Sequence, residues 1–239
     1  MRKTFYTIIF LSSIVLSTSL LTSCGCITGN GPVVKSEREI RSANHLIIEV
    51  DGDIIIHQSD TASLFVTTQS NIQKHIRISK RGDKITVKAS RCFTQAPPLT
   101  IEIGLPNFES LTVNSSAKVQ SKGKKIDAES FNIVSNKDAI INLNISTVDM
   151  HVTAGGRTKL FLNGFSRNIV VDLKENSQLL AIGFPVVEAS CKLFANSYLK
   201  LQVQKKLVAN VETQATLEYI AKQGLETNIT GAGKVKQLD

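Results

Sequence analysis

The stretch FNIVSNKDAIINLNISTVDMHVTAGGRTKLFLNGFSRNIVVDL, residues 131–173, contains consecutive copies of a unit of about 20 residues. The unit recurs seven times between Leu111 and Asp239. The copies align on seven apolar residues: Val113, Ile133, Val152, Leu173, Leu193, Val211 and Ile229. Apolar residues also stand two positions before most of these anchors, and six and eight positions after them. This period of two is typical of strands with one buried face, so each unit predicts two short strands joined by a polar corner.

Coils of this length cannot bury an inner face alone. Stacking them at the spacing of paired strands, about 4.8 Å, makes one continuous core. The sequence therefore predicts an all-β protein, a β-solenoid with coils of about 20 residues. A leucine-rich repeat has a similar period, but its Leu-x-x-Leu-x-Leu pattern and recurring Asn are missing. Helical repeats are longer and need apolar residues at three- and four-residue spacing.

The corners between the strands are small or polar, as at Glu175-Asn176 and Ala195-Asn196. Small residues permit tight bends, and Gly supplies positive φ. Asn residues recur at one repeat position, where they either stack through their amides or are simply solvated. The next column predicts a surface charge ladder in which Asp138 lies between Lys118 and Arg157.

Composition and local pattern divide the chain into four segments. Gly and Pro between residues 24 and 45 indicate a tether. Further along, Arg81-Gly82-Asp83-Lys84 predicts a hairpin turn. The expected segments are a signal peptide at 1–23, a lipidated cysteine and tether at 24–45, N-terminal β coils with insertions at 46–110, and regular solenoid repeats at 111–239.

The N-terminus reads as a secretory signal, with Arg2-Lys3 before an apolar run. The run ends Leu21-Thr22-Ser23-Cys24, which resembles a bacterial lipobox. The resemblance implies cleavage before Cys24 and acylation of its thiol, which anchors a chain without spanning the bilayer. We therefore expect a membrane partner at Cys24 and a cell-envelope address at the outer membrane. No acidic run follows Cys24, which favours the periplasmic face over the cell surface.

Three further cysteines are Cys26, Cys92 and Cys191. Cys191 occupies an inward column of the repeat and is expected to be a buried core thiol. Cys92 can pair with either Cys191 or Cys26 in an oxidising compartment, and the sequence leaves both pairings open. No Cys or His spacing indicates a zinc site.

Searching for reaction chemistry gives no catalytic residue, metal ligand or cofactor motif. The histidines are dispersed, His151 is expected to face solvent, and the carboxylates Asp149, Asp172 and Glu188 fall at different repeat positions. The net charge of +8 is not combined with clustered aromatic residues, so nucleic acid is not an expected partner. Asp60-Thr61-Ala62 has the form of a bacterial O-glycosylation site. A ligand-binding site remains unassigned.

Two N-terminal stretches and the corners carry a family resemblance. Gly29-Asn-Gly-Pro-Val-Val-Lys-Ser-Glu-Arg-Glu-Ile, Ile48-Glu-Val-Asp-Gly-Asp-Ile-Ile-Ile-His-Gln-Ser-Asp and Thr230-Gly-Ala-Gly-Lys234 resemble the putative auto-transporter adhesin, head GIN domain family of Bacteroidetes-type envelope proteins. The resemblance implies a right-handed parallel β-helix and an envelope lipoprotein. The other corners depart from the family's glycine-rich form, and the resemblance carries no functional residue.

Two functions follow from these observations. The first is a non-enzymatic envelope lipoprotein whose solenoid serves adhesion or binds envelope polysaccharide or protein. The alternative is a carbohydrate-active β-helix enzyme, similar to a pectinase or lyase, on acidic glycans. The alternative predicts a groove with at least two carboxylates within about 10 Å of each other.

Overall fold

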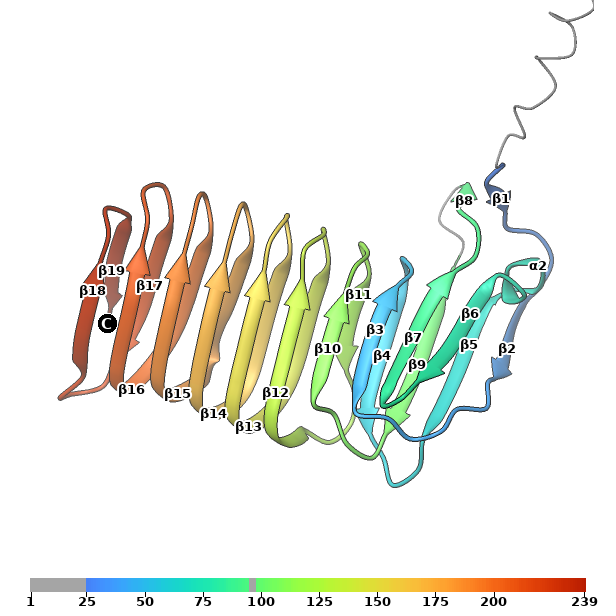
Figure 1. Ribbon diagram of the computed structural model, residues 1–239, viewed down its shortest axis with the longest axis horizontal. Coiled ribbons are helices and arrows are strands. Elements are labelled where there is room, and N and C mark those ends of the chain that lie inside the picture. The colour runs from blue at the N-terminus through green and yellow to red at the C-terminus, as the bar shows by residue number, and fades with distance from the viewer. Residues whose placement is uncertain (1–24, 95–97) are drawn as a thin grey trace, which may run out of the picture.

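The computed structural model describes residues 25–94 and 98–239, which form a rod of stacked β coils (Figure 1). A cap of additional strands covers the N-terminal end of the rod, and the regular coils extend from it to the C-terminus. Among the described residues, no helix has the length and apolar character needed to cross a membrane.

The regular part of the rod is an all-parallel solenoid, as the sequence predicts. Each long strand runs along one face, bends, and continues along the other, and it pairs in parallel with the next strand about 20 residues on. The strands are β10(Ser110–Val113), β11(Lys118–Ser121), β12(Ile126–Ser135), β13(Ile140–Ala154), β14(Lys159–Leu173), β15(Gln178–Leu193), β16(Tyr198–Val211), β17(Thr216–Ala221), β18(Glu226–Thr230) and β19(Lys234–Leu238).

The two faces enclose a single apolar core. The predicted anchors Val113, Ile133 and Val152 are all buried, so the inward face of each strand is predicted correctly. Ile133 and Val152 stack as predicted, but the preceding step was predicted incorrectly, because Ile133 pairs with Leu111, and Val113 pairs with Ser135. The error is a slip of two residues. Ser135 is buried in an inward column, but its polarity made it look like a corner residue, and a two-residue slip leaves the same face inside.

The corner columns are confirmed in part. Arg157 forms an ion pair with Asp138, but Lys118 lies beside Ile140 instead of completing the ladder. The amide of Asn196 donates to Oδ1 of Asn176 at 3.4 Å, so these two asparagines do stack.

Four N-terminal strands build two coils whose order along the rod is inverted. The strands are β3(His45–Glu49), β4(Asp53–Gln58), β7(Lys84–Ala89) and β9(Thr100–Leu105). The first coil, β3 and β4, lies between β7 and β9 on one side and β10 and β11 on the other. The chain therefore leaves the first coil, completes the end of the rod, and returns to the first coil's opposite edge.

The cap is antiparallel and is not part of the coil pattern. It contains β2(Val33–Glu37), β5(Ser63–Gln69), α2(Ser70–Gln73) and β6(Ile76–Arg81). β5 pairs with β2 and β9, and β6 pairs with β7 through the predicted hairpin at Arg81–Lys84. The buried side chain of Gln73 fastens β2 to β5, because its amide donates to the carbonyls of Val34 at 2.8 Å and Val66 at 2.9 Å.

The structure contains one of the two cysteine pairings that the sequence left open. Cys26 and Cys92 form a disulfide, which joins the start of the described chain to the cap beside β1(Ile27–Thr28) and β8(Phe93–Thr94). Cys191 is free and buried, as expected.

Candidate functional site

The residues singled out in the sequence do not converge on one site. Cys24, the expected lipidation site, lies outside the described residues. Thr61 of the glycosylation-like tripeptide is exposed, and His151 faces solvent as expected. Within residues 25–94 and 98–239, no group of His, Cys, Asp and Glu is arranged to hold a metal ion.

One hollow, of about 780 Å³, gathers carboxylates at the edge of the rod beside β10, β12 and β13. Three of its four carboxylates have structural partners. Asp149 accepts a hydrogen bond from Asn168 at 2.7 Å, Glu109 accepts one from Asn44 at 2.8 Å, and Asp127 lies 3.9 Å from Lys125. The first two contacts tie Asp149 and Glu109 to neighbouring coils, whereas Lys125 and Asp127 belong to the same coil.

A second candidate surface is the flat face formed by β11, β17 and the first halves of β13 to β16. Phe161 and Leu180 stack in one outward column, and Tyr198 projects from the next coil beside them. All three are half-buried, while Ile140 on the same face is 40% exposed. We call the surface made by Ile140, Phe161, Leu180, Tyr198 and Lys200 the aromatic face.

Polar groups flank these apolar side chains in fixed positions. The Tyr198 hydroxyl donates to Oε2 of Glu218 at 2.8 Å, and the Lys200 ammonium lies 3.5 Å from the same oxygen. Burial, followed by the hydrogen bond and charge of Glu218, raises the pKa of Tyr198 to about 12. The hydrogen bond from Tyr198 and the charge of Lys200 hold the pKa of Glu218 below its ordinary value. The tyrosine is therefore a neutral donor held in one orientation.

Outward amides extend the same face on either side. Asn142 precedes Phe161 in its column, and Asn144 and Asn163 form a parallel column beside it. Asn142, Asn144 and Asn163 are exposed. With such an arrangement, the flat apolar strip can stack on an extended polar ligand while the rows of amides hydrogen-bond to it.

This surface was not predicted from the sequence, because the apolar alternation reports only on the inward columns. The available signal was the repeat offset itself: Tyr198 and Glu218 are 20 residues apart, and Lys200 is the register partner of Glu218. Reading the outward positions at the same period would have placed these side chains on neighbouring coils.

Comparison with solved structures shows the same fold at low sequence identity. A crystal structure of a putative adhesin from Bacteroides fragilis is 14% identical, covers 89% of this chain and 100% of its own, and has a TM-score of 0.77. A putative adhesin and a putative lipid binding protein from Parabacteroides distasonis, each 14% identical and each covering 90% of this chain and 100% of their own, have TM-scores of 0.69 and 0.70.

The curated proteins contain no match to this sequence. The family model described as "Putative auto-transporter adhesin, head GIN domain" matches residues 44–223, which span the first two coils, the cap strands β5 and β6, and most of the regular solenoid. This agrees with the resemblance read from the N-terminal stretches and the corners. The chain therefore belongs to the putative auto-transporter adhesin, head GIN domain family.

Proposed function

We propose that this protein is a non-enzymatic adhesin of the cell envelope, anchored by a lipid at Cys24, whose aromatic face binds polysaccharide. The observation that supports this most directly is the aromatic face itself. Phe161, Leu180 and Tyr198 stay partly exposed on a flat surface although the core beneath them is mostly apolar. Apolar side chains retained in this way on an outer face mark interaction surfaces.

The chemistry of the face suits a sugar chain. The apolar side of a pyranose ring stacks on aromatic side chains, and its hydroxyl groups need fixed donors and acceptors beside them. Tyr198, Glu218 and Lys200 supply these groups in a bonded triad, and the amides of Asn142 and Asn163 add further ones. A repeating ligand can contact several coils at once, which raises its overall affinity through multivalency.

The test is binding of the purified chain to a panel of bacterial envelope polysaccharides. Phe161→Ala should weaken binding roughly 10-fold, because loss of a stacked aromatic ring removes about 1 kcal/mol or more. Val208→Ala is the matched control, because Val208 is an exposed apolar residue on the opposite face. Equal binding by both variants, or no binding to any polysaccharide, would contradict the assignment.

The anchor has its own test. Mass spectrometry of the chain isolated from membranes should show a mature N-terminus at Cys24 carrying acyl chains, and Cys24→Ser should abolish that mass increase. The adhesin family name is consistent with an envelope or extracellular address, and the proposed location is the periplasmic face of the outer membrane, because no acidic run follows Cys24.

The alternative function, an enzyme acting on acidic glycans, is favoured by one observation, the hollow lined by Asp127, Glu129, Asp149 and Glu109. It predicts release of oligosaccharides from pectin-like substrates, and loss of that release in Asp149→Asn. We expect no release from either protein, because Asp149 and Glu109 are already bonded to structural partners.

A further inference from the structure

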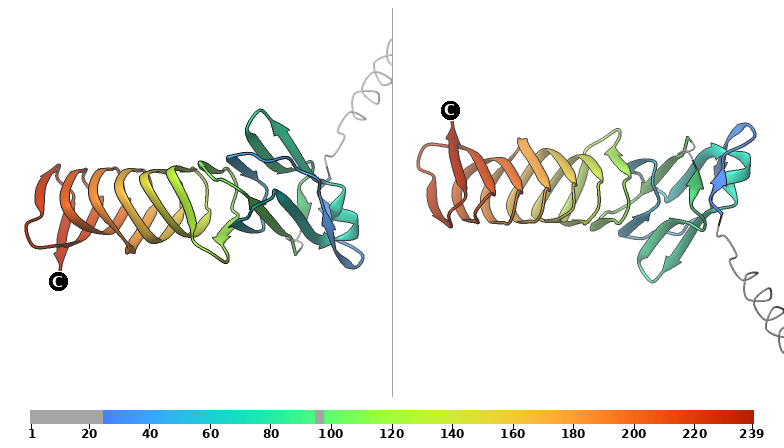
Figure 2. Two further views of the ribbon diagram at one scale, coloured as in Figure 1. Left: turned by 90° about the horizontal axis from the view of Figure 1, so that it is seen from below. Right: turned by 90° about the horizontal axis from the view of Figure 1, so that it is seen from above.

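The hairpin formed by β6 and β7 concentrates positive charge at the N-terminal end of the rod. Residues 74–91 contain seven Lys and Arg residues and one acidic residue, Asp83. Figure 2 shows the hairpin projecting sideways from the cap instead of following the outline of the coils. The rest of the chain distributes its charges more evenly between the two signs.

Register places the basic side chains of the hairpin directly opposite one another. Arg77 pairs with Lys88, and Arg81 pairs with Lys84, so four cations project from the same outer face with Ser79 and Thr86 between them. All four are exposed, and none has an ion-pair partner within the part of the chain that the structure describes. Like charges directly opposite in a sheet are destabilising, so folding alone does not explain this arrangement.

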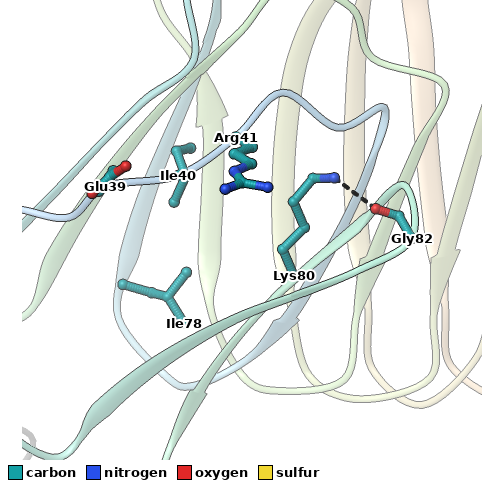
Figure 3. Close-up of a pocket in the computed structure, with 6 residues that line it drawn as sticks. All are labelled: Glu39, Ile40, Arg41, Ile78, Lys80 and Gly82. Carbon is teal, nitrogen blue, oxygen red and sulfur yellow. Dashed lines mark hydrogen bonds between the residues drawn. The ribbon is translucent and has the colours of Figure 1, made fainter.

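The other side of the hairpin faces two more cations, Arg41 and Lys80, and one carboxylate, Glu39. A hollow of about 390 Å³ lies between the hairpin and the chain at residues 39–41 (Figure 3). Arg41 and Lys80 lie next to each other on one side of it, and Ile40 and Ile78 lie on the other. The Lys80 ammonium donates to the carbonyl of Gly82 at 2.7 Å, which holds it near the hairpin turn.

Protection of a sheet edge explains only half of this pattern. β6 is an edge strand, and charged side chains on an edge prevent pairing with another chain. β7 is an interior strand, paired with β3 and β6, yet it contributes Lys84 and Lys88, of which only Lys88 has an acidic register partner, Glu49 of β3. Edge protection also works with either sign of charge, whereas this hairpin is almost entirely positive. A negatively charged partner accounts for both facts.

The disulfide places the hairpin next to the expected anchor. Cys92 follows β7 by three residues and is bonded to Cys26, with 4.6 Å between the two Cα atoms. Cys24 is two residues before Cys26 in the sequence, and two residues of fully extended chain span about 7 Å. A lipid on Cys24 would therefore hold the base of the hairpin at the membrane surface.

We propose that the β6–β7 hairpin is a second membrane contact, in which Arg77, Arg81, Lys84 and Lys88 bind the anionic headgroups of phospholipids. The proposal rests on the proposed lipid anchor at Cys24. Basic residues close to an anionic bilayer each contribute to binding, and a lipid chain combined with a basic patch fixes a protein more firmly than a lipid chain alone. The contact would also fix the angle at which the rod leaves the membrane.

The test uses the full chain isolated with its anchor and reconstituted into vesicles of phosphatidylcholine, with or without phosphatidylglycerol. A polarity-sensitive fluorophore attached to Ser79→Cys, between the two basic pairs, reports whether the hairpin touches the bilayer. The label should be shielded from acrylamide quenching only in vesicles that contain phosphatidylglycerol, and high salt should expose it again.

Replacing Arg77, Arg81, Lys84 and Lys88 together by Gln should reduce the ratio of shielded to exposed label about 100-fold or more. The matched control replaces four exposed lysines elsewhere by Gln, namely Lys122, Lys124, Lys205 and Lys222, and should leave that ratio unchanged. Thermal melting of the hairpin variant should not fall below that of the parent chain, because the removed charges repel one another.

Flotation with neutral vesicles separates failure of this proposal from failure of the anchor. A chain that floats with neutral vesicles, but whose label is equally quenched in both vesicle types, overturns the hairpin contact and leaves the anchor intact. A chain that does not float with neutral vesicles contradicts the anchor, while the label still reports on the hairpin. Shielding by a soluble polyuronate but not by anionic vesicles would also overturn the membrane contact and assign the hairpin to polysaccharide.

Discussion

The side chain of Cys191 lies inside the solenoid, with Val171 and Ala209 as its register partners on either side. It is 2% exposed, and burial raises the pKa of its thiol to about 12. The thiolate is the reactive form of cysteine, so both access and ionisation are withheld from this residue in the folded protein.

We therefore expect Cys191 to resist alkylation by iodoacetamide at pH 8 and to react fully in denaturant. After mild reduction, Cys26 and Cys92 should react in the native protein, because both are exposed. Peptide mass spectrometry reads out each position separately. Rapid native alkylation of Cys191 would contradict its placement in the core.

Burial of Tyr198, together with its hydrogen bond to Glu218, predicts a pH dependence of stability. Because the pKa of Tyr198 rises from 10.0 to about 12 in the folded chain, its stabilising effect is complete below pH 10 and is lost as the pH rises toward 12. The urea midpoint of the wild type should therefore fall more steeply between pH 10 and 12 than that of Tyr198→Phe. Parallel curves for the two proteins would show that this bond is not maintained in solution.

At the scale of the single element, the corners show where the solenoid departs from ideal backbone geometry. Three residues that carry side chains adopt positive φ at corners: Glu175 at 58°, Ala195 at 54° and Gln214 at 75°. Gly156 occupies the corresponding position one coil before Glu175, at 63°. A Cβ there would lie 2.5 Å from the carbonyl oxygen of Lys137, so this corner also requires glycine for space.

Ala195→Gly should raise the free energy of unfolding by about 0.5 kcal/mol, because relief of the left-handed backbone exceeds the added chain entropy of glycine. Gly156→Ala should lower the free energy of unfolding by about 2 kcal/mol, since it adds both backbone strain and the contact with Lys137. Urea titration measures both changes. Ala209→Gly, at a buried strand position, is the control and should only destabilise.

The strands also show how much of the fold could be predicted from the sequence. Alternation of apolar residues identified the inward face of each strand and the parallel stacking, since both follow from a period of two within a period of about 20. The alternation did not predict that Val113 pairs with Ser135 and Val152 with Val171, because either of two inward positions satisfies the same pattern. The alternation did not predict the triad of Tyr198, Lys200 and Glu218 either, since it reports on inward side chains and these three point outward.

At the scale of the whole molecule, the Cys26–Cys92 disulfide closes a loop of 66 residues across the cap, yet it joins only β1 to the rod. Among the described residues, β1 and β8 pair only with each other, so breaking the disulfide should unfold this part of the chain alone.

Reduction should therefore free residues 25–27 while leaving the coils folded, because the side chain of Asn71 still holds Thr28 and Asn30. Hydrogen exchange should rise at β1 and β8 and stay unchanged at β13 to β16. The Cys92→Ser variant should behave like the reduced protein, and Cys191→Ser tests whether any effect comes from the third cysteine. A global loss of protection on reduction would show that the cap supports the entire rod.

Because the order of the first two coils is inverted, the chain from Ser59 to Leu105, which includes the second coil, is an insert whose two ends lie next to each other. The backbone amide of Ser59 donates to the carbonyl of Leu105 at 3.0 Å, so the chain departs and returns at almost the same point. Splicing out that detour would shorten the protein without breaking the path from β4 to β10. What remained would begin with bare strands β3 and β4, and such ladders recruit further copies of themselves. The insert therefore keeps the protein from assembling end to end into a filament.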